Sequence, residues 1–485
     1  MARRATVVGS GPNGLAGAAA LARAGFDVRV IEAYETIGGG TRTAELTLPG
    51  FRHDVCSAVH PGALDSPIFR ALGLRESVEW IIPEISYAHP LDDGRAGIAW
   101  HDIERTADGL GADSDAWRDV LGPLVRRYNG VADFTGNQML RVPHDPVAAI
   151  RFGLRSLRVG TGRSRGVFAT DEARGLLTGV LAHANTRLPS LAAAGAGLLL
   201  ATQAHNSGWP LPRGGAQSVA DALAADILAH GGSIETGTHV HDLADLDWGD
   251  PAAGDVLLLD TAPRLALSHP DAPISWARKV YEYRYGPAAS KVDFALDGPV
   301  PWANADVARA VTVHLGGTRG AIENAENTVA RGGIPANPFV LVTQPSVADD
   351  SRAPAGRHTL WAYMHVPNGS DFDATEAITR QVERYAPGFR DIILASHAST
   401  ARDLATYNPS AIGGDFAGGA VTMPQLLGRP VMSSAPWRTP MRGIYLASAA
   451  TPPGPGVNGM AGWYAARLAI RDATGERVEL ADLPA

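Results

Sequence analysis

Short apolar runs separated by glycines open the chain. Ala5–Val8 predicts a buried strand, and the small residues after it predict a helix that ends near Ala24, where Gly25 follows. Asp27–Ile31 predicts a second strand. A strand, a helix and a second strand in this order indicate a βαβ unit with parallel strands.

A second regular pattern lies near the middle of the chain. Val219, Leu223 and Ile227 recur every four residues, which predicts an amphipathic helix over Ser218–His230. Glycines follow at once and end it. The next segments predict strands that complete the same interrupted sheet: Ile234–Glu235, Thr238–His241 and the buried run within Asp255–Pro263.

The longest apolar run is Leu191–Ala204. It is too short and too rich in glycine to span a bilayer, so it predicts a buried helix. A helix lying on a membrane surface stays open as an alternative, although this run contains neither Lys nor Arg. The apolar stretch near the first residue is too short for a signal peptide, so we expect a cytoplasmic protein, with peripheral membrane contact left open.

Composition narrows the class of protein. With 485 residues the chain is long enough for two or three domains, and 45% hydrophobic with 19% charged residues is typical of a globular protein. A net charge of −8 argues against a nucleic-acid partner. The one cysteine, Cys56, excludes an intrachain disulfide, and only two lysines occur, Lys279 and Lys291.

Three glycines between the first strand and helix carry the clearest chemistry. Gly9, Gly11 and Gly14 form G-x-G-x-x-G, which allows a tight turn, a close approach to a pyrophosphate and close packing of helix on strand. The N-terminus of the helix then faces the phosphates. Glu32 ends the second strand, where a carboxylate accepts hydrogen bonds from the adenosine ribose. The unit predicts a dinucleotide site.

The segment after Glu32 favours FAD over NAD. Ile37–Thr43 reads IGGGTRT. With three successive glycines, among them Gly39 and Gly40, followed by Arg42 and Thr43, this segment resembles the Gly-Gly-x-x-Arg-Ser/Thr signature of the amine oxidase and phytoene desaturase flavoproteins. Arg42 would neutralise the pyrophosphate.

The resemblance extends along nearly the whole chain, to about residue 470. Segments such as GWPLPRGGAQSVADAL, YNPSAIGGDFAGG and GIYLASAATPPGPGVNGMAGWYAA are similar to bacterial phytoene desaturase-like oxidoreductases, in particular the branch whose first loop reads G-x-G-P-N-G-L. The resemblance implies an α/β fold, with a glutathione-reductase-type FAD-binding Rossmann domain and a discontinuous α+β substrate domain. It places FAD binding in residues 1–75, 206–265 and 401–485, and substrate binding in 76–205 and 266–400.

The loop Thr451–Met460 is dense in proline and glycine and leads into the last predicted helix. The resemblance implies that it passes the isoalloxazine ring, with backbone donors near the flavin pyrimidine edge, where they stabilise the reduced state. The expected contacts to noncovalent FAD are then Gly9, Gly11, Pro12, Asn13, Gly14, Glu32, Ala33, Gly39, Gly40, Thr41, Arg42, Thr43, Val240, Ser448, Gly456, Val457, Asn458, Gly459 and Met460.

Residues that could act on substrate are fewer. The candidates are Asn458, His60 and Asp415. Each has a purely structural role as its alternative, and for Asp415 this role is to stabilise a turn. His183 and His205 are expected to be satisfied, partly buried histidines, and Cys56 a small buried hydrophobe. No metal site is expected, including at His239 and His241.

The combined features predict an enzyme that dehydrogenates a largely apolar organic substrate by hydride transfer to flavin N5, with electrons passing to O2 or a quinone. Three alternatives stay open: a flavin amine oxidase acting on a C–N bond, a redox-neutral flavin-dependent isomerase, and a non-catalytic scaffold stabilised by flavin. A homodimer is also left open.

Overall fold

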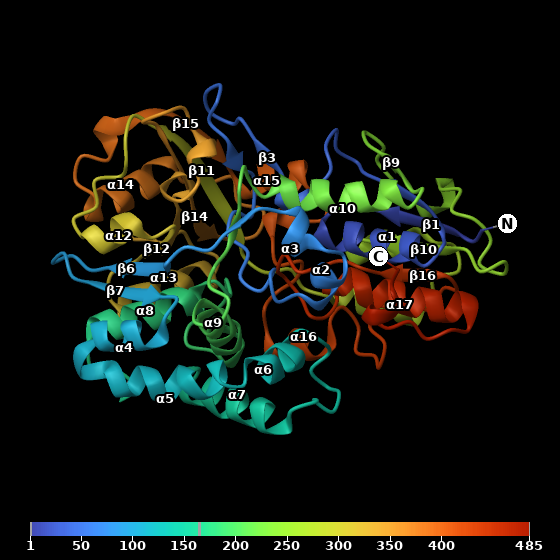
Figure 1. The fold of residues 1–485 in the computed structure, drawn as a ribbon, viewed down its shortest axis with the longest axis horizontal. Helices are drawn as coiled ribbons and strands as arrows, with labels where there is room; N and C mark the ends of the chain where they lie inside the picture. Colours follow the sequence, from blue (N-terminus) through green and yellow to red (C-terminus); the bar gives the residue numbers. More distant parts are fainter. Residues whose placement is uncertain (1, 163–165, 485) are drawn as a thin grey trace.

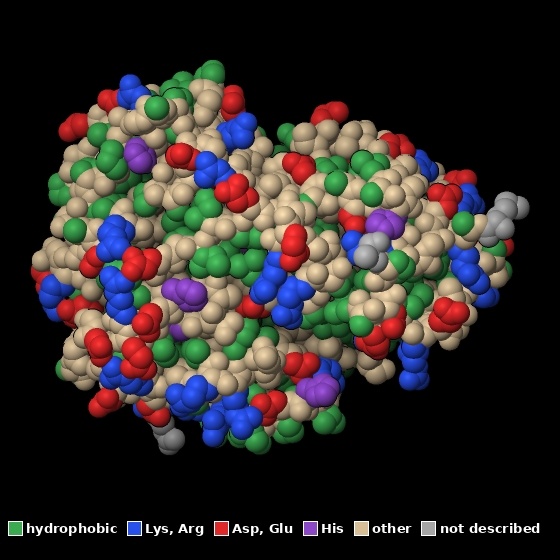
Figure 2. Space-filling model, viewed as in Figure 1, with side chains coloured by type: hydrophobic (Ala, Val, Ile, Leu, Met, Phe, Trp, Pro, Cys, Tyr) green, Lys and Arg blue, Asp and Glu red, His purple; other side chains and the backbone are tan. Residues whose placement is uncertain are grey.

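Two β-sheets organise the chain in the computed structural model, which describes residues 2–162 and 166–484 (Figure 1). The smaller sheet and its helices lie on the right of the view. The larger sheet lies on the left, above a layer of helices. Basic and acidic side chains are interspersed over the face seen in the same view (Figure 2). Among the described residues, no helix is both long enough and apolar enough to cross a membrane.

The smaller sheet is parallel and has β1 at its centre. Its strands run in the order β16-β10-β1-β2-β9, and Val8 of β1 lies opposite both Ile31 of β2 and Leu259 of β10. The carboxyl ends of these strands therefore meet at one edge, where ligands bind in open α/β sheets. The bounds are β1 Arg4–Val8, β2 Asp27–Ile31, β9 Ser233–Glu235, β10 Val256–Leu259 and β16 Ile444–Leu446.

The predicted βαβ unit is confirmed, and one predicted strand is wrong. Thr238–His241 forms no strand, because Gly237 takes a positive φ of 70° and turns the chain across the end of β2. The backbone N–H of Thr238 donates to the carbonyl of Glu32 over 2.9 Å. The alternating side chains of this segment therefore reflect a chain lying along a cavity wall, rather than a sheet.

Three helices pack on the parallel sheet, and the backbones of two of them, α1 and α17, approach each other closely. These are α1 (Pro12–Arg23), α10 (Gln217–Ala229) and α17 (Met460–Thr474). A Cβ added at Gly462 of α17 would overlap the backbone oxygen of Asn13 in α1. The last helix is therefore locked against the helix that follows the glycine-rich loop.

The larger sheet has seven strands in the order β15-β11-β14-β13-β12-β6-β7, and most of its pairs are antiparallel. Its bounds are β6 Ile85–Pro90, β7 Ala96–Trp100, β11 Ala288–Leu296, β12 Thr312–Leu315, β13 Val340–Thr343, β14 His358–Val366 and β15 Ile393–Ser399. The helices below it in Figure 1 are α4 Ile103–Gly109, α5 Ser114–Val125, α6 Tyr128–Thr135, α7 Pro146–Val159, α8 Asp171–Ala182 and α9 Leu191–Ala204.

The strands of each sheet come from alternating segments of the chain. Those of the smaller sheet fall within residues 1–75, 206–265 and 401–485, and those of the larger within 76–205 and 266–400. The limits of the two domains stay a prediction. The run Leu191–Ala204 does form a helix, α9, which packs against α7 and α8 inside the protein.

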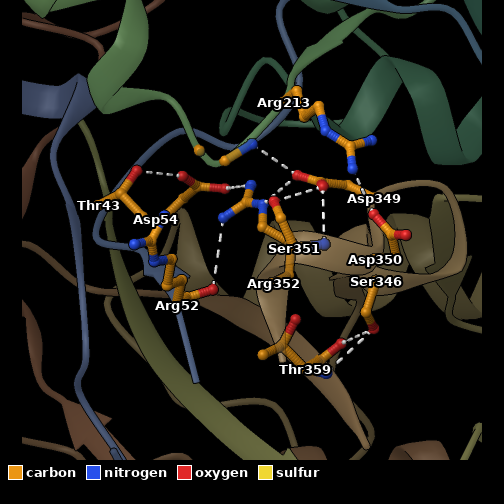
Figure 3. A network of polar contacts seen from close by, with 12 residues as sticks. Thr43, Arg52, Asp54, Arg213, Ser346, Asp349, Asp350, Ser351, Arg352 and Thr359 are labelled. Carbon is orange, nitrogen blue, oxygen red and sulfur yellow. Dashed lines mark hydrogen bonds and ion pairs between the residues drawn. The ribbon is translucent and has the colours of Figure 1, made fainter. Parts of the chain in front are cut away.

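A fully buried arginine joins the segments that carry the two sheets (Figure 3). Arg352 pairs with Asp54 and, over 3.0 Å, with Asp349. Asp54 also accepts hydrogen bonds from the Thr43 hydroxyl at 2.7 Å and from the Ala216 backbone N–H at 2.8 Å. Burial alone would raise the pKa of Asp54, but Arg352 and these donors hold it below its ordinary value.

We expect Arg352→Met to lower the free energy of unfolding by about 3–5 kcal/mol, because it leaves two buried carboxylates without their cation. The measurement is urea unfolding of the FAD-loaded protein, followed by tryptophan fluorescence. Arg213→Met is the matched control, since Arg213 pairs with Asp350 in the same region but is 39% exposed. It should change stability little. Equal losses in the two variants would contradict a special role for the buried triad.

Candidate functional site

A cavity of about 1310 Å³ lies between the two sheets. Its wall combines the carboxyl edge of the parallel sheet with side chains from β11, β12, β13 and β14. Single small-molecule pockets usually hold roughly 300–1,000 Å³, so this cavity has room for more than one ligand. Its two ends differ in chemistry.

One end is formed by the glycine-rich loop. Gly9 takes a φ of +97°, and Gly11 is the N-cap of α1. A Cβ at Gly14 would overlap the backbone oxygen of Gly9, so the loop can close only with glycine there. The N–H groups and partial positive charge of a helix N-terminus attract phosphate, and this cradle fits the pyrophosphate of a dinucleotide.

Asp260 lies directly against this cradle and was not predicted as a site residue. It follows β10, and its Oδ2 accepts a hydrogen bond from the Gly14 N–H at 2.8 Å. Burial raises the pKa of Asp260 to about 8, and the nearby charge of Glu32 adds to the rise. A signal did exist, since a polar residue directly after a buried parallel strand lies at the ligand-binding edge.

Glu32 and Arg42 form an ion pair in the cavity wall. Arg42 Nη2 donates to Glu32 Oε1 at 2.9 Å, while Glu32 Oε2 accepts from the Ser10 backbone N–H at 2.9 Å. The Arg42 guanidinium also lies 4.6 Å from the Tyr34 ring centroid and 5.0 Å from that of Tyr407. Arg42 therefore neutralises Glu32 in this structure, and its contact with the pyrophosphate stays a prediction.

Most of the predicted cofactor contacts line the cavity. They are Gly9, Gly11, Pro12, Asn13, Glu32, Ala33, Gly39, Gly40, Arg42, Val240, Ser448, Gly456, Val457 and Asn458.

Five predicted contacts lie behind the cavity wall: Gly14, Thr41, Thr43, Gly459 and Met460. Thr41 donates its hydroxyl hydrogen to the carbonyl of Gly38, and Thr43 donates to Asp54. Their hydroxyls support the loop and the buried triad, and contact of these five residues with the cofactor stays a prediction.

Packing gives Gly459 a structural reason in addition to the predicted cofactor contact. Its φ is +67°, and a Cβ there would lie 2.8 Å from Ala16 and 2.7 Å from Phe69. Glycine is required by packing against α1, away from the cavity. Asn458 Oδ1 accepts from the Met460 N–H at 3.0 Å, so this side chain occupies the first N–H of α17, a donor expected to face the flavin.

The other end of the cavity is apolar and aromatic. Its wall includes Leu199, Trp209, Leu341, Trp361, Tyr363 and Phe416. Lys291 of β11 also lines it, although its side chain is only 3% exposed. Its ammonium pairs with Asp293 and lies 5.6 Å from the Trp361 ring centroid. The sequence analysis did not predict Lys291 as a site residue. A signal was present, because a lysine is unusual within an otherwise largely apolar strand such as AASKVDFAL.

The catalytic candidates His60 and Asp415 both line the cavity. Burial lowers the pKa of His60 to about 4, and its Nε2 has no hydrogen-bond partner among the described residues. Asp415 accepts from the backbone N–H groups of Gly286 at 2.7 Å and Ala417 at 2.8 Å. Asp415 therefore stabilises a turn in this structure, and burial raises its pKa.

The two other histidines singled out from the sequence, His183 and His205, have partners, and Cys56 lies in the cavity wall. His183 Nε2 lies 2.7 Å from His314 Nε2, and His205 bonds to Trp117 and to the carbonyl of Trp100, so both predicted histidines have partners. Burial lowers the pKa of His183 to about 3. Cys56 is half-buried and faces the cavity, and burial raises the pKa of its thiol.

Comparison with known proteins agrees with this geometry. Residues 13–469 match the family model described as flavin containing amine oxidoreductase. The chain is 24% identical to the rat (Rattus norvegicus) pyridine nucleotide-disulfide oxidoreductase domain-containing protein 2, covering 96% of this chain and 93% of that protein. It is 24% identical to a neurosporene-forming phytoene desaturase of Rhodobacter capsulatus, covering 95% and 92%.

A similar solved structure is cyclohexylamine oxidase from Brevibacterium oxydans. Its TM-score is 0.55 at 16% identity, with 98% of this chain and 99% of that chain covered. At this identity the likeness establishes the fold.

The position of Asp260 predicts that FAD binding depends on pH. A protonated carboxyl can lie beside the pyrophosphate, whereas a carboxylate there repels it. The dissociation constant of FAD should therefore be flat below about pH 8 and rise above it by up to about tenfold per pH unit, because the free protein must then take up a proton. Titration of the apoprotein with FAD, followed by flavin fluorescence, measures this.

Asp260→Asn is the matched variant, since it keeps the shape and removes the titration. Its dissociation constant should stay flat through pH 8. An unchanged rise in the variant would assign the dependence to another group.

Proposed function

The chain belongs to the family of flavin containing amine oxidoreductases, and from this we propose that it dehydrogenates a largely apolar organic substrate. Family membership makes it an FAD-dependent oxidoreductase. The substrate, the electron acceptor and the noncovalent attachment of FAD belong to the proposal. O2 or a quinone is the proposed acceptor.

The observation that supports this substrate class is the continuity of the cavity. One space runs from the glycine-rich cradle to a wall of Trp209, Trp361, Tyr363 and Phe416. A substrate held there would bury apolar surface and would place a C–H bond near the cofactor without water between them.

When bound, FAD supplies the acceptor for a hydride, that is, a proton with two electrons. A dehydrogenated substrate also loses a second hydrogen, as a proton, from the adjacent atom. His60 is the proposed acceptor or relay of that proton, because it lines the cavity and its Nε2 is unpartnered among the described residues. Its low pKa makes it a weak base, so the proton should pass on to solvent.

Lys291 has the complementary role in this proposal. Hydride transfer brings negative charge into a cavity with low dielectric constant, and a fixed ammonium stabilises it there. Asp293 and the ring of Trp361 hold the ammonium in place. The side chain is built into a strand, so little reorganisation is needed during the reaction.

Oxidation of a C–N bond is the second candidate function. The match to the family model over residues 13–469 favours this reaction, because the description of that family is flavin containing amine oxidoreductase. One experiment distinguishes the two reactions. The FAD-loaded protein is mixed under anaerobic conditions with a panel of apolar alkenes and alcohols and, separately, with a panel of amines. Bleaching of oxidised flavin by the apolar compounds supports the proposal, and bleaching by amines alone supports the second candidate. Oxygen uptake after readmission of air tests the acceptor.

We expect Lys291→Met to slow flavin reduction by about a hundredfold, since one preorganised electrostatic contact typically accounts for about 10²–10³ in rate. Stopped-flow absorbance under anaerobic conditions measures it. Lys279→Met is the control, because Lys279 is the other lysine of the chain and is exposed on α11 (Ile274–Glu282).

The double variant Lys291→Met/Asp293→Asn controls for an unpaired buried carboxylate, and it should fold better than the single variant yet remain slow. Recovery of the wild-type rate in the double variant would mean that the ammonium only balances Asp293.

A further inference from the structure

Helix α7 is apolar on two opposite faces. Ala148, Phe152 and Val159 are buried against the neighbouring helices. A second stripe points outward: Val147 is 44% exposed, Ile150 62%, Leu154 59% and Leu157 50%. These four residues, named here the α7 stripe, recur at intervals of three or four along the helix, so they lie on one side of it.

The exposed apolar surface continues beyond the helix. Leu140 and Val142, in the loop before α7, are 55% and 86% exposed, and Met432 is 61% exposed. Gln138 of the same loop donates to the carbonyl of Ser433, which links the two loops. Figure 2 shows hydrophobic side chains beside basic ones along the lower edge, where Figure 1 places α7. The α7 stripe is itself contiguous, because its residues are neighbours on one side of the helix, and exposed apolar surface of this kind marks an interaction site.

The charge of this region is opposite to that of the whole protein. Residues 126–159 contain six arginines, two aspartates and no lysine or glutamate, a net charge of +4, whereas the chain carries −8. Arg151 and Arg158 are exposed on α7 itself, and Arg158 pairs with Asp119 of α5. Helices that lie in a membrane interface combine an apolar face with flanking Lys or Arg that attract anionic lipid.

The α7 stripe also adjoins the cavity. Leu157 is half exposed, and it lines the cavity together with Phe152, Gly153 and Ser156. Phe134 and Met139, which precede α7, line it as well. The outward apolar surface and the apolar end of the cavity are therefore continuous through one helix.

We propose that α7 docks the protein on an anionic lipid bilayer, with the α7 stripe inserted among the lipids and its arginines at the headgroups. We therefore assign this surface to a membrane rather than to a second protein chain. The apolar stripe suits the acyl region of a bilayer, and the flanking arginines suit the anionic headgroups above it. This docking goes beyond the proposed function, and it holds whichever substrate class enters the cavity.

The test is co-sedimentation of the FAD-loaded protein with vesicles. Vesicles of phosphatidylcholine mixed with phosphatidylglycerol should bind the protein, and pure phosphatidylcholine vesicles should bind it at least about tenfold less tightly. Binding should weaken as salt is raised, because screening acts on the arginine contacts. Since the whole protein is negatively charged, binding to anionic vesicles would report a local surface.

Ile150→Ser/Leu154→Ser should lower vesicle binding about tenfold or more, and Arg151→Gln should lower it on anionic vesicles. Ile274→Ser is the matched control, since Ile274 is 88% exposed on α11, outside the α7 stripe. All variants should keep the FAD content and melting temperature of the wild type. Equal vesicle binding by the stripe variant and the control would overturn the proposal. So would a wild-type dimer in light scattering that the stripe variant abolishes, because the stripe would then be an interface between copies of the chain.

Discussion

The buried ion triad of Arg352, Asp54 and Asp349 is the constraint on which the arrangement of the two sheets depends. Three charges without access to water are tolerable only if each is paired and hydrogen-bonded, and that requirement fixes where two distant segments meet. Asp54 belongs to the segment after the glycine motifs, and Arg352 to the loop before β14. The triad therefore sets the distance between the nucleotide edge of one sheet and the strands that form the opposite cavity wall. Next to Asp54, His53 Nδ1 lies 3.5 Å from Asp293, the partner of Lys291, but no hydrogen bond joins the two, and burial lowers the pKa of His53 to about 3.

Charge is distributed unevenly between the two ends of the cavity. Asp260 and Glu32 bring two carboxyl groups to the end that would receive a pyrophosphate, and Arg42 compensates only one of them. Proton uptake by Asp260 is the simplest way to remove the conflict, because burial already raises the pKa of this carboxyl to about 8. At the other end a single ammonium, Lys291, lies among apolar and aromatic side chains. The cofactor site is thus coupled to protons at one end and to a fixed cation at the other.

Local patterns predicted the parts of the fold in which local physics decides the outcome. The strand, the glycine turn, the helix and the acid at Glu32 follow from residues close together in the chain, and the helix ending before Gly231 follows from its period. The prediction failed where contacts with residues distant in the sequence determine the conformation of a segment or the environment of a side chain. Thr238–His241 alternates because it lies along the cavity wall, and Lys291 becomes significant only when β11 is paired with β14. The outward stripe of α7 was missed because its apolar residues have the same helical period as a buried face.

The loop Thr451–Met460 shows how one segment can meet two demands on its backbone. Gly456, Val457 and Asn458 line the cavity, whereas Gly459 packs against Ala16 of α1 and against Phe69; contact of this loop with the flavin stays a prediction. The chain must turn from the cavity wall into α17 within a few residues, while α17 must approach α1 closely enough that Gly462 has no room for a side chain. Both demands act on backbone position, so glycine satisfies each of them. Composition alone cannot separate a backbone held near a ligand from a backbone held near a helix. Here the loop both lines the cavity and packs against α1, and its position against α1 fixes the wall that the cofactor would meet.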